Sequence, residues 1–170
     1  CYFGIFSECT GLTSAPKLPA NVLANNCYGW MFKGCSALTS APELPATEMG
    51  SYCYNGMFAN CTKLTSAPEL PAKRLESNCY NCMFEGCTSL TSAPELPAKE
   101  LIRNCYQLMF KDCSKLRYVK ALFTTSPSEE TTKDWLSGVA ASGTFVKSKN
   151  ATWNVTGVHS IPKGWKIETQ

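Results

Sequence analysis

Ten of the eleven cysteines mark a repeat of 26 residues. One series starts at Cys1 and continues through Cys27, Cys53, Cys79 and Cys105; the other starts at Cys9 and continues through Cys35, Cys61, Cys87 and Cys113. The unit reads C-Y-x-x-M-F-x-x-C-x-x-L-T-S-A-P-E-L-P-A, followed by six variable residues. A period of about 20 to 50 residues is typical of proteins in which each unit buries its apolar face against its neighbours. The period therefore predicts a solenoid.

The first half of each unit has the apolar spacing of a short helix. At roughly 100° per residue, the apolar residues of segment 53–64 share one side, and small or polar residues fall on the other. The residues on the apolar side are Cys53, Tyr54, Met57, Phe58 and Cys61. We therefore expect five helices, one near each Cys-Tyr, at 26-residue intervals.

The second half of each unit, such as Leu38 to Pro45, predicts a very short strand, because a β-branched Thr is followed by two prolines. The first proline of each pair is expected to interrupt the strand ladder at the same height in every repeat. An apolar residue in each variable stretch is expected to fill the core where the chain turns back, namely Leu23, Met49, Leu75 and Leu101. One short strand and one short helix per unit predict a curved α/β solenoid of five repeats over residues 1–123.

Residues 124–170 leave the repeat pattern and are predicted to form a small C-terminal α+β cap. Ser126-Pro127-Ser128-Glu129 has the pattern of a capping box that opens a helix carrying Trp135, Leu136 and Val139. Segments 143–146 and 165–168 are expected to be strands.

The cysteine geometry favours buried, unbridged thiols. Cys53 and Cys61 would lie roughly 12 Å apart along one helix, whereas bonded cysteines need Cα atoms within about 7 Å. Cys82 falls on the polar side of its helix and is expected to be the exposed thiol. Cys79 and Cys82 form the sole C-x-x-C, and His159 is the one histidine, far along the chain. We therefore expect no metal, no cofactor and no catalytic centre.

The charge is spread thinly along the chain. Residues 1–123 carry 11 Lys and Arg against 9 Asp and Glu, and residues 124–170 carry 5 against 4. Because nucleic-acid binding normally needs a concentrated basic face, it is not expected. Nor does any window approach the roughly 18 consecutive apolar residues of a membrane helix, so no membrane insertion is expected. Position 1 already lies inside a repeat, so a secretion signal is expected outside this sequence.

The unit resembles a known repeat family. Met31-Phe32-Lys33-Gly34-Cys35-Ser36-Ala37-Leu38 is similar to the first half of the BspA-like leucine-rich repeat of bacterial surface proteins, also called the Treponema pallidum type. The second half departs from that family, because Ala41 and Pro42 replace a bulky Ile and its neighbour and the unit is longer. The resemblance implies a leucine-rich-repeat solenoid in a secreted or cell-surface protein.

A repeated polar face is the predicted binding surface. It combines Thr39, Ser40 and Glu43 with Thr65, Ser66, Glu69, Thr91, Ser92 and Glu95. Lys17 completes the row of Glu43, Glu69 and Glu95. A rival surface uses the variable positions Trp30, Lys33 and Glu85.

Together with the resemblance, this face predicts a non-catalytic interaction or adhesion module at the cell surface or outside the cell. The expected partner is an extracellular protein or glycan. The alternative is a structural spacer that displays another domain of a longer surface protein. The oligomeric state is left open.

Overall fold

Turns and extended segments make up most of the computed structural model, which describes residues 2–170. The described part holds five short strands and one four-residue helix, α1 (Glu129–Thr132). The strands are β1 (Val22–Leu23), β2 (Glu48–Met49), β3 (Tyr118–Ala121), β4 (Thr144–Lys147) and β5 (Lys166–Thr169). None of the five helices predicted near the Cys-Tyr pairs is present among residues 2–170.

The segments predicted as helices are chains of tight turns. In the third repeat, the Met57 N–H donates to the Tyr54 carbonyl at 3.1 Å, three residues back. Tyr54, Gly56 and Asn60 have φ values of 58°, 57° and 62°. Left-handed residues at such short intervals interrupt a right-handed helix, and glycine and asparagine accept this conformation most readily. The same alternation recurs in the other repeats, with Gly34, Gly86 and Asp112 at the position of Asn60.

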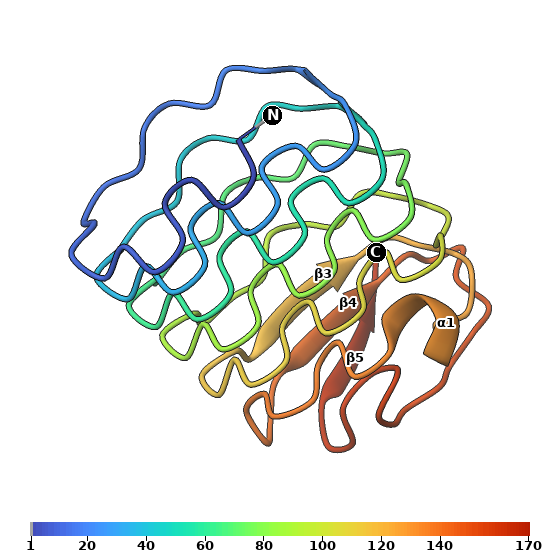
Figure 1. Ribbon diagram of the computed structural model, residues 1–170. Helices are drawn as coiled ribbons and strands as arrows, with labels where there is room; N and C mark the ends of the chain where they lie inside the picture. Colours follow the sequence, from blue (N-terminus) through green and yellow to red (C-terminus); the bar gives the residue numbers. More distant parts are fainter. Residues whose placement is uncertain (1) are drawn as a thin grey trace.

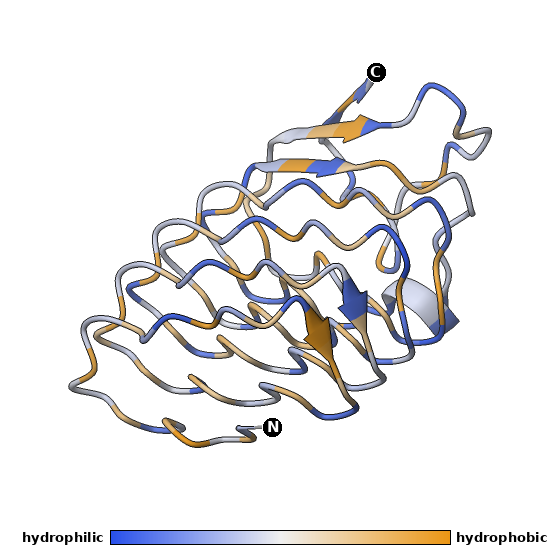
Figure 2. Ribbon diagram, turned by 90° about the horizontal axis from the view of Figure 1, so that it is seen from above, coloured by the Kyte–Doolittle hydropathy of each residue, from blue (hydrophilic) through white to orange (hydrophobic). Residues whose placement is uncertain are grey.

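Backbone hydrogen bonds between consecutive repeats replace the bonds of a helix. Each repeated Phe from Phe6 to Phe84 donates its N–H to a Met carbonyl 25 residues further along the chain, and Phe110 donates to the Trp135 carbonyl in the same way. The distances are 2.9 Å from Phe32 to Met57 and 2.9 Å from Phe58 to Met83. Bonds of this kind recur between repeats, so that each repeat lies beside the next from the N-terminus to the C-terminal strands (Figures 1 and 2).

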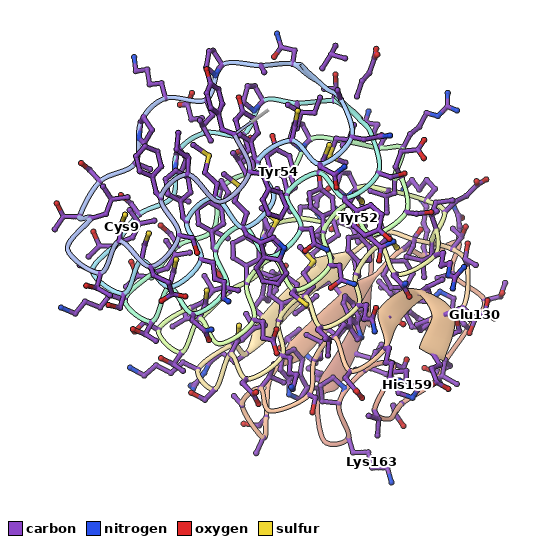
Figure 3. The ribbon with its side chains drawn as sticks, in the orientation of Figure 1. Cys9, Tyr52, Tyr54, Glu130, His159 and Lys163 are labelled. Atoms are coloured by element: carbon purple, nitrogen blue, oxygen red, sulfur yellow. The ribbon has the colours of Figure 1, made fainter. Side chains whose placement is uncertain are left out.

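Two columns of aromatic rings fill the core between the turns and the extended segments. The phenylalanine rings stack with centroids 5.5 to 5.7 Å apart, and the tyrosine rings stack 6.0 to 6.3 Å apart. Tyr54, in the middle of its column, lies in the interior (Figure 3) and is 1% exposed. Tyr106, the last tyrosine, stacks on Trp135 at 6.1 Å. Ring stacking therefore runs from the first repeat into the C-terminal region.

The strands pair in parallel, in register with the repeat. β1 pairs with β2 so that Leu23 lies opposite Met49, 26 residues on. β3, β4 and β5 form a three-stranded sheet in that order, with Tyr118 opposite Thr144. The apolar residues predicted to fill the core at the turn are all buried, namely Leu23, Met49, Leu75 and Leu101.

The predicted fold class, a curved α/β leucine-rich-repeat solenoid, is wrong. Helix is limited to α1 among residues 2–170, and the strands form two small parallel sheets. The prediction failed because apolar residues spaced for one side of a helix are also buried by stacked turns. Asn55, Gly56 and Ala59, assigned to the polar side, are buried as well.

The C-terminal region matches its prediction in part. The expected strands at 143–146 and 165–168 are present as β4 and β5, each displaced by one residue. The helix is wrong in extent: Ser128 rather than Ser126 is its N-cap, and it ends before Trp135. The boundary between residues 1–123 and 124–170 stays a prediction. The four residue pairs of β3 with β4 join the two regions in one sheet.

We predict that Gly56→Ala lowers the free energy of unfolding by roughly 1–3 kcal/mol. Its φ is positive, and an added Cβ would overlap the Trp30 ring of the preceding repeat. The matched control is Gly11→Ala, because a Cβ there meets nothing within 4 Å and its φ is not positive. Urea denaturation of both variants is the measurement. Equal effects would show that Gly56 is not constrained by the stacked turns.

Candidate interaction surface

All nine residues of the predicted polar face are exposed. The Thr-Ser pairs lie immediately before the Pro-Glu-Leu-Pro segments, and Ser40 forms a parallel β-bridge with Ser66. The Thr65 hydroxyl donates to the Thr39 carbonyl at 3.3 Å, so this hydroxyl contacts the neighbouring repeat. The face is thus brought together as predicted, in rows that cross the repeats. Whether it binds a partner stays a prediction.

Paired prolines stop the strand ladder beside this face. Between the fourth and fifth repeats, where the fifth has no proline pair, Ala93 and Leu96 donate their N–H groups to Tyr118 and Lys120, both at 2.9 Å. Within residues 2–170, Leu70, which corresponds to Leu96, has no such bond. Because proline has no N–H, two of the four residues in each Pro-Glu-Leu-Pro segment cannot donate. The neighbouring segments therefore lie side by side without a continuous ladder.

A row of shallow pockets lies between these unpaired segments. Their volumes are about 340 Å³ between the first and second repeats, 450 Å³ between the second and third, and 450 Å³ between the third and fourth. Pro42, Glu43 and Pro45 line the first two pockets, and the next repeat's equivalents are shared in the same way. The pockets therefore form one groove across the repeats. We call it the proline–glutamate groove, and its residues are 16–19, 42–45, 68–71 and 94–97.

The groove combines apolar walls with a row of charges. Leu44 and Leu70 are each 3% exposed beside the prolines, whereas Glu43 and Glu69 are exposed. Glu95 forms an ion pair with Lys120, with the Nζ and a carboxylate oxygen 2.8 Å apart. No ion pair involves Glu43 or Glu69 within residues 2–170. Two neighbouring carboxylates are thus available to a partner.

The sequence did not single out the prolines, the leucines or Lys120 as part of this site. The proline pairs were the available signal for the groove, because they predict that the ladder stops at the same height in every repeat. Nothing in the sequence indicates the ion pair of Lys120 with Glu95, which depends on how the fifth repeat lies beside the fourth.

The rival surface is occupied by contacts within the protein. The Trp30 ring lies against Gly56, and the Lys33 ammonium lies 5.3 Å from the ring centroid. Glu85 forms an ion pair with Lys111 at 3.4 Å. These variable positions join consecutive repeats, so they are less available to a partner than the groove.

Most of the periodic cysteines form a buried column of free thiols. Cys61 donates its S–H to the Phe32 carbonyl at 3.1 Å, and Cys87 donates to Phe58 at 3.1 Å. Burial raises the pKa of Cys61 to about 12 and raises the pKa of Cys87 well above its ordinary value. Neutral thiols that pack as small apolar groups are inert. The prediction of buried free thiols is confirmed for Cys35, Cys53, Cys61, Cys79, Cys87, Cys105 and Cys113.

The predictions for three other cysteines are wrong: Cys27 and Cys9 were expected to be buried and unbridged, and Cys82 was expected to be exposed. Cys27 is disulfide-bonded, and Cys9, in the first repeat, is exposed and free (Figure 3). Cys82, expected to be exposed, is 8% exposed and its S–H donates to the Asn81 side chain at 2.7 Å. Its helical placement was wrong, so its expected exposure was wrong too. Cys1 lies outside the described residues.

The histidine belongs to the C-terminal region and not to the groove. The backbone N–H of Asp134 donates to the His159 Nδ1 at 3.2 Å. The backbone carbonyl of His159 accepts a hydrogen bond from the Thr132 hydroxyl. Residues 2–170 hold no group of three or more His, Cys, Asp or Glu side chains placed to bind a metal ion. Over the same residues α1 is the one helix, and its four residues are too few to cross a membrane.

Comparisons with known proteins leave the family open. No family model, curated protein or solved structure matches the chain. The resemblance to BspA-like repeats therefore stays a prediction that rests on short motifs such as residues 31–38.

We predict that, of the cysteines described as free, Cys9 alone reacts rapidly with a thiol reagent in the folded protein, because the others are buried. Mass spectrometry after brief alkylation would identify the labelled residue. The control is Cys9→Ser, which should abolish rapid labelling of these thiols in the folded protein. After unfolding, this variant should show one labelled thiol fewer than the unchanged protein. Rapid labelling of Cys61 or Cys87 would contradict the buried column.

We also predict that stability falls as pH rises from about 9 to about 12. The folded pKa of Cys61 is raised from the ordinary value of 9.0 to about 12, so the unfolded chain loses this proton first and the stabilisation present below pH 9 is lost. A thiol of this kind contributes a slope of up to about 1.4 kcal/mol per pH unit in that window. Urea denaturation at pH 8 to 11 is the measurement. Cys61→Ala should show a shallower slope than the unchanged protein, and identical slopes would refute the assignment.

Proposed function

We propose that the protein is a non-catalytic interaction or adhesion module, secreted or at the cell surface, that binds an extracellular protein or glycan through the proline–glutamate groove. The observation that carries the proposal is the recurrence of one pocket chemistry between successive repeats. Each pocket offers proline rings and a buried leucine beside exposed charge. A row of equivalent weak sites suits a partner that is itself extended and repetitive.

The groove also has the composition of a binding surface rather than a reaction site. Proline, leucine, alanine, glutamate and lysine line its pockets. Acyl transfer and similar reactions need a nucleophile with a base within hydrogen-bond reach. The buried thiols with raised pKa values do not supply such a nucleophile. These observations support a role without catalysis, and the surface location rests on the resemblance of the repeat motif.

A structural spacer is the second candidate. The aromatic columns and the inter-repeat hydrogen bonds run from the first repeat to Trp135, and such continuous stacking favours a stiff unit. A spacer needs no partner for the groove, so a binding screen separates the two candidates.

We predict that a screen against extracellular-matrix proteins and mucin glycans finds a partner whose binding is weakened at least tenfold by changing Glu43, Glu69 and Glu95 to Lys. Reversing the charges of Glu43 and Glu69 replaces attraction of a basic partner by repulsion, and changing Glu95 also removes its ion pair with Lys120. The matched control changes Glu48, Glu76 and Glu100 to Lys, which are exposed but do not line the groove. Surface plasmon resonance is the measurement. Binding that survives the groove changes would exclude this face, and no binding to any member of the panel would favour the spacer.

A further inference from the structure

We propose that the groove selects an extended peptide segment whose charges run acidic, basic, basic, in register with Lys17, Glu43 and Glu69. This inference rests on the proposed function and names the chemistry of the partner. It follows from which charges of the groove are free, from the spacing of the repeats, and from the side chains that surround the charges.

The free charges define a short order along the groove. Lys17 and Glu43 line the first pocket, and Glu43 and Glu69 line the second. Within residues 2–170, none of these three side chains forms an ion pair. The next member of the row, Glu95, is already paired with Lys120, which is 19% exposed. The available order is therefore positive, negative, negative.

The third pocket limits the number of basic groups that a partner can place along the groove. Lys73 lines it together with Glu69 and Glu95. A further basic group of a partner would meet Lys73 there, and the neighbouring carboxylate of Glu95 is already neutralised by Lys120. Two basic groups thus fit the groove better than three.

The spacing of the repeats is within reach of alternate residues of an extended chain. Equivalent rings in the core of consecutive repeats lie 5.5 to 6.3 Å apart, and beside the groove the parallel bridge of Ser40 with Ser66 sets a strand spacing of about 4.8 Å. In an extended strand or a polyproline helix, residues i and i+2 lie roughly 6.2 to 6.8 Å apart along the chain. Side chains at alternate positions of one segment can therefore reach consecutive members of the row, because flexible Lys and Glu side chains take up a difference of up to about 2 Å per step.

The walls of the groove favour a peptide over a glycan. The methylene stem of a lysine can lie along the rings of Pro42 and Pro45 while its ammonium group reaches Glu43 or Glu69. Acidic sugars would bring further negative charge to these carboxylates. The pocket walls supply aliphatic rather than aromatic surface for a sugar ring to stack on.

The test uses two labelled peptides of the same composition. One carries the order acidic, basic, basic (Ala-Asp-Ala-Lys-Ala-Lys-Ala), and the other carries basic, acidic, basic (Ala-Lys-Ala-Asp-Ala-Lys-Ala). Reversal of direction cannot convert one order into the other. Fluorescence anisotropy at low salt should show the first peptide binding three- to tenfold more tightly, and the preference should shrink at high salt because exposed charges are screened.

A charge-swapped protein provides the second arm. The combined changes Lys17→Glu, Glu43→Lys and Glu69→Lys should make the protein prefer a peptide of order basic, acidic, acidic over its scrambled form. The single change Glu69→Gln, which is milder for folding, should lower the preference of the unchanged protein by about threefold. The control with Glu48, Glu76 and Glu100 changed to Lys should keep the original preference.

Equal affinity for the two peptides, or a preference that the charge swap leaves unchanged, would overturn the inference. The proposed function would survive that result if the matrix and glycan screen still found a partner sensitive to the groove changes. If that partner were a glycan alone, the peptide assignment would be wrong. If the screen found no partner while the peptide preference held, the adhesion proposal would fail and the charge order would stand.

Discussion

The hydrogen bond from a repeated phenylalanine to the next repeat is the interaction on which the rest of the structure depends. Phe32, Phe58 and Phe84 each use their N–H in this way, so every repeat needs its neighbour to satisfy its own backbone. A helix would satisfy these groups internally and leave the spacing between repeats to side chains. Here the backbone itself fixes that spacing, and the stacked rings and the column of thiols follow from it.

The groove arises from the same stacking, in the second half of each repeat. Stacking fixed by the turns brings consecutive Pro-Glu-Leu-Pro segments side by side, and the prolines deny them a ladder of their own. The fifth repeat has no proline pair, and there the ladder does form: Ala93 and Leu96 of the fourth repeat donate their N–H groups to Tyr118 and Lys120 of the fifth. The pockets are therefore a consequence of two prolines per repeat held at a common height. Lys17 of the first segment and the exposed Glu of each later segment give the row its charge.

The sequence predicted burial better than it predicted conformation. Met57, Phe58 and Cys61 are buried as expected, because a 26-residue period makes identical residues meet wherever the repeats stack. The prediction of a helix in each repeat was wrong because residue spacing alone does not distinguish one side of a helix from the inner side of stacked turns. The better signal was the Gly, Asn or Asp seven residues after the first cysteine of the second to fifth repeats, as in Gly34 and Asn60, which tolerates a positive φ. The exposed polar face was predictable from its repetition, whereas the ion pair of Lys120 with Glu95 depends on tertiary placement.

Through-hydrogen-bond scalar coupling measured by NMR tests the central claim most directly. The account predicts a coupling between the amide nitrogen of Phe58 and the carbonyl carbon of Met83, since the N–H and the oxygen are hydrogen-bonded across the repeats at 2.9 Å. The equivalent coupling is expected from Phe84 to Met109. A coupling from Phe58 to the carbonyl of Tyr54, four residues back, is the mark of an α-helix and would contradict the account.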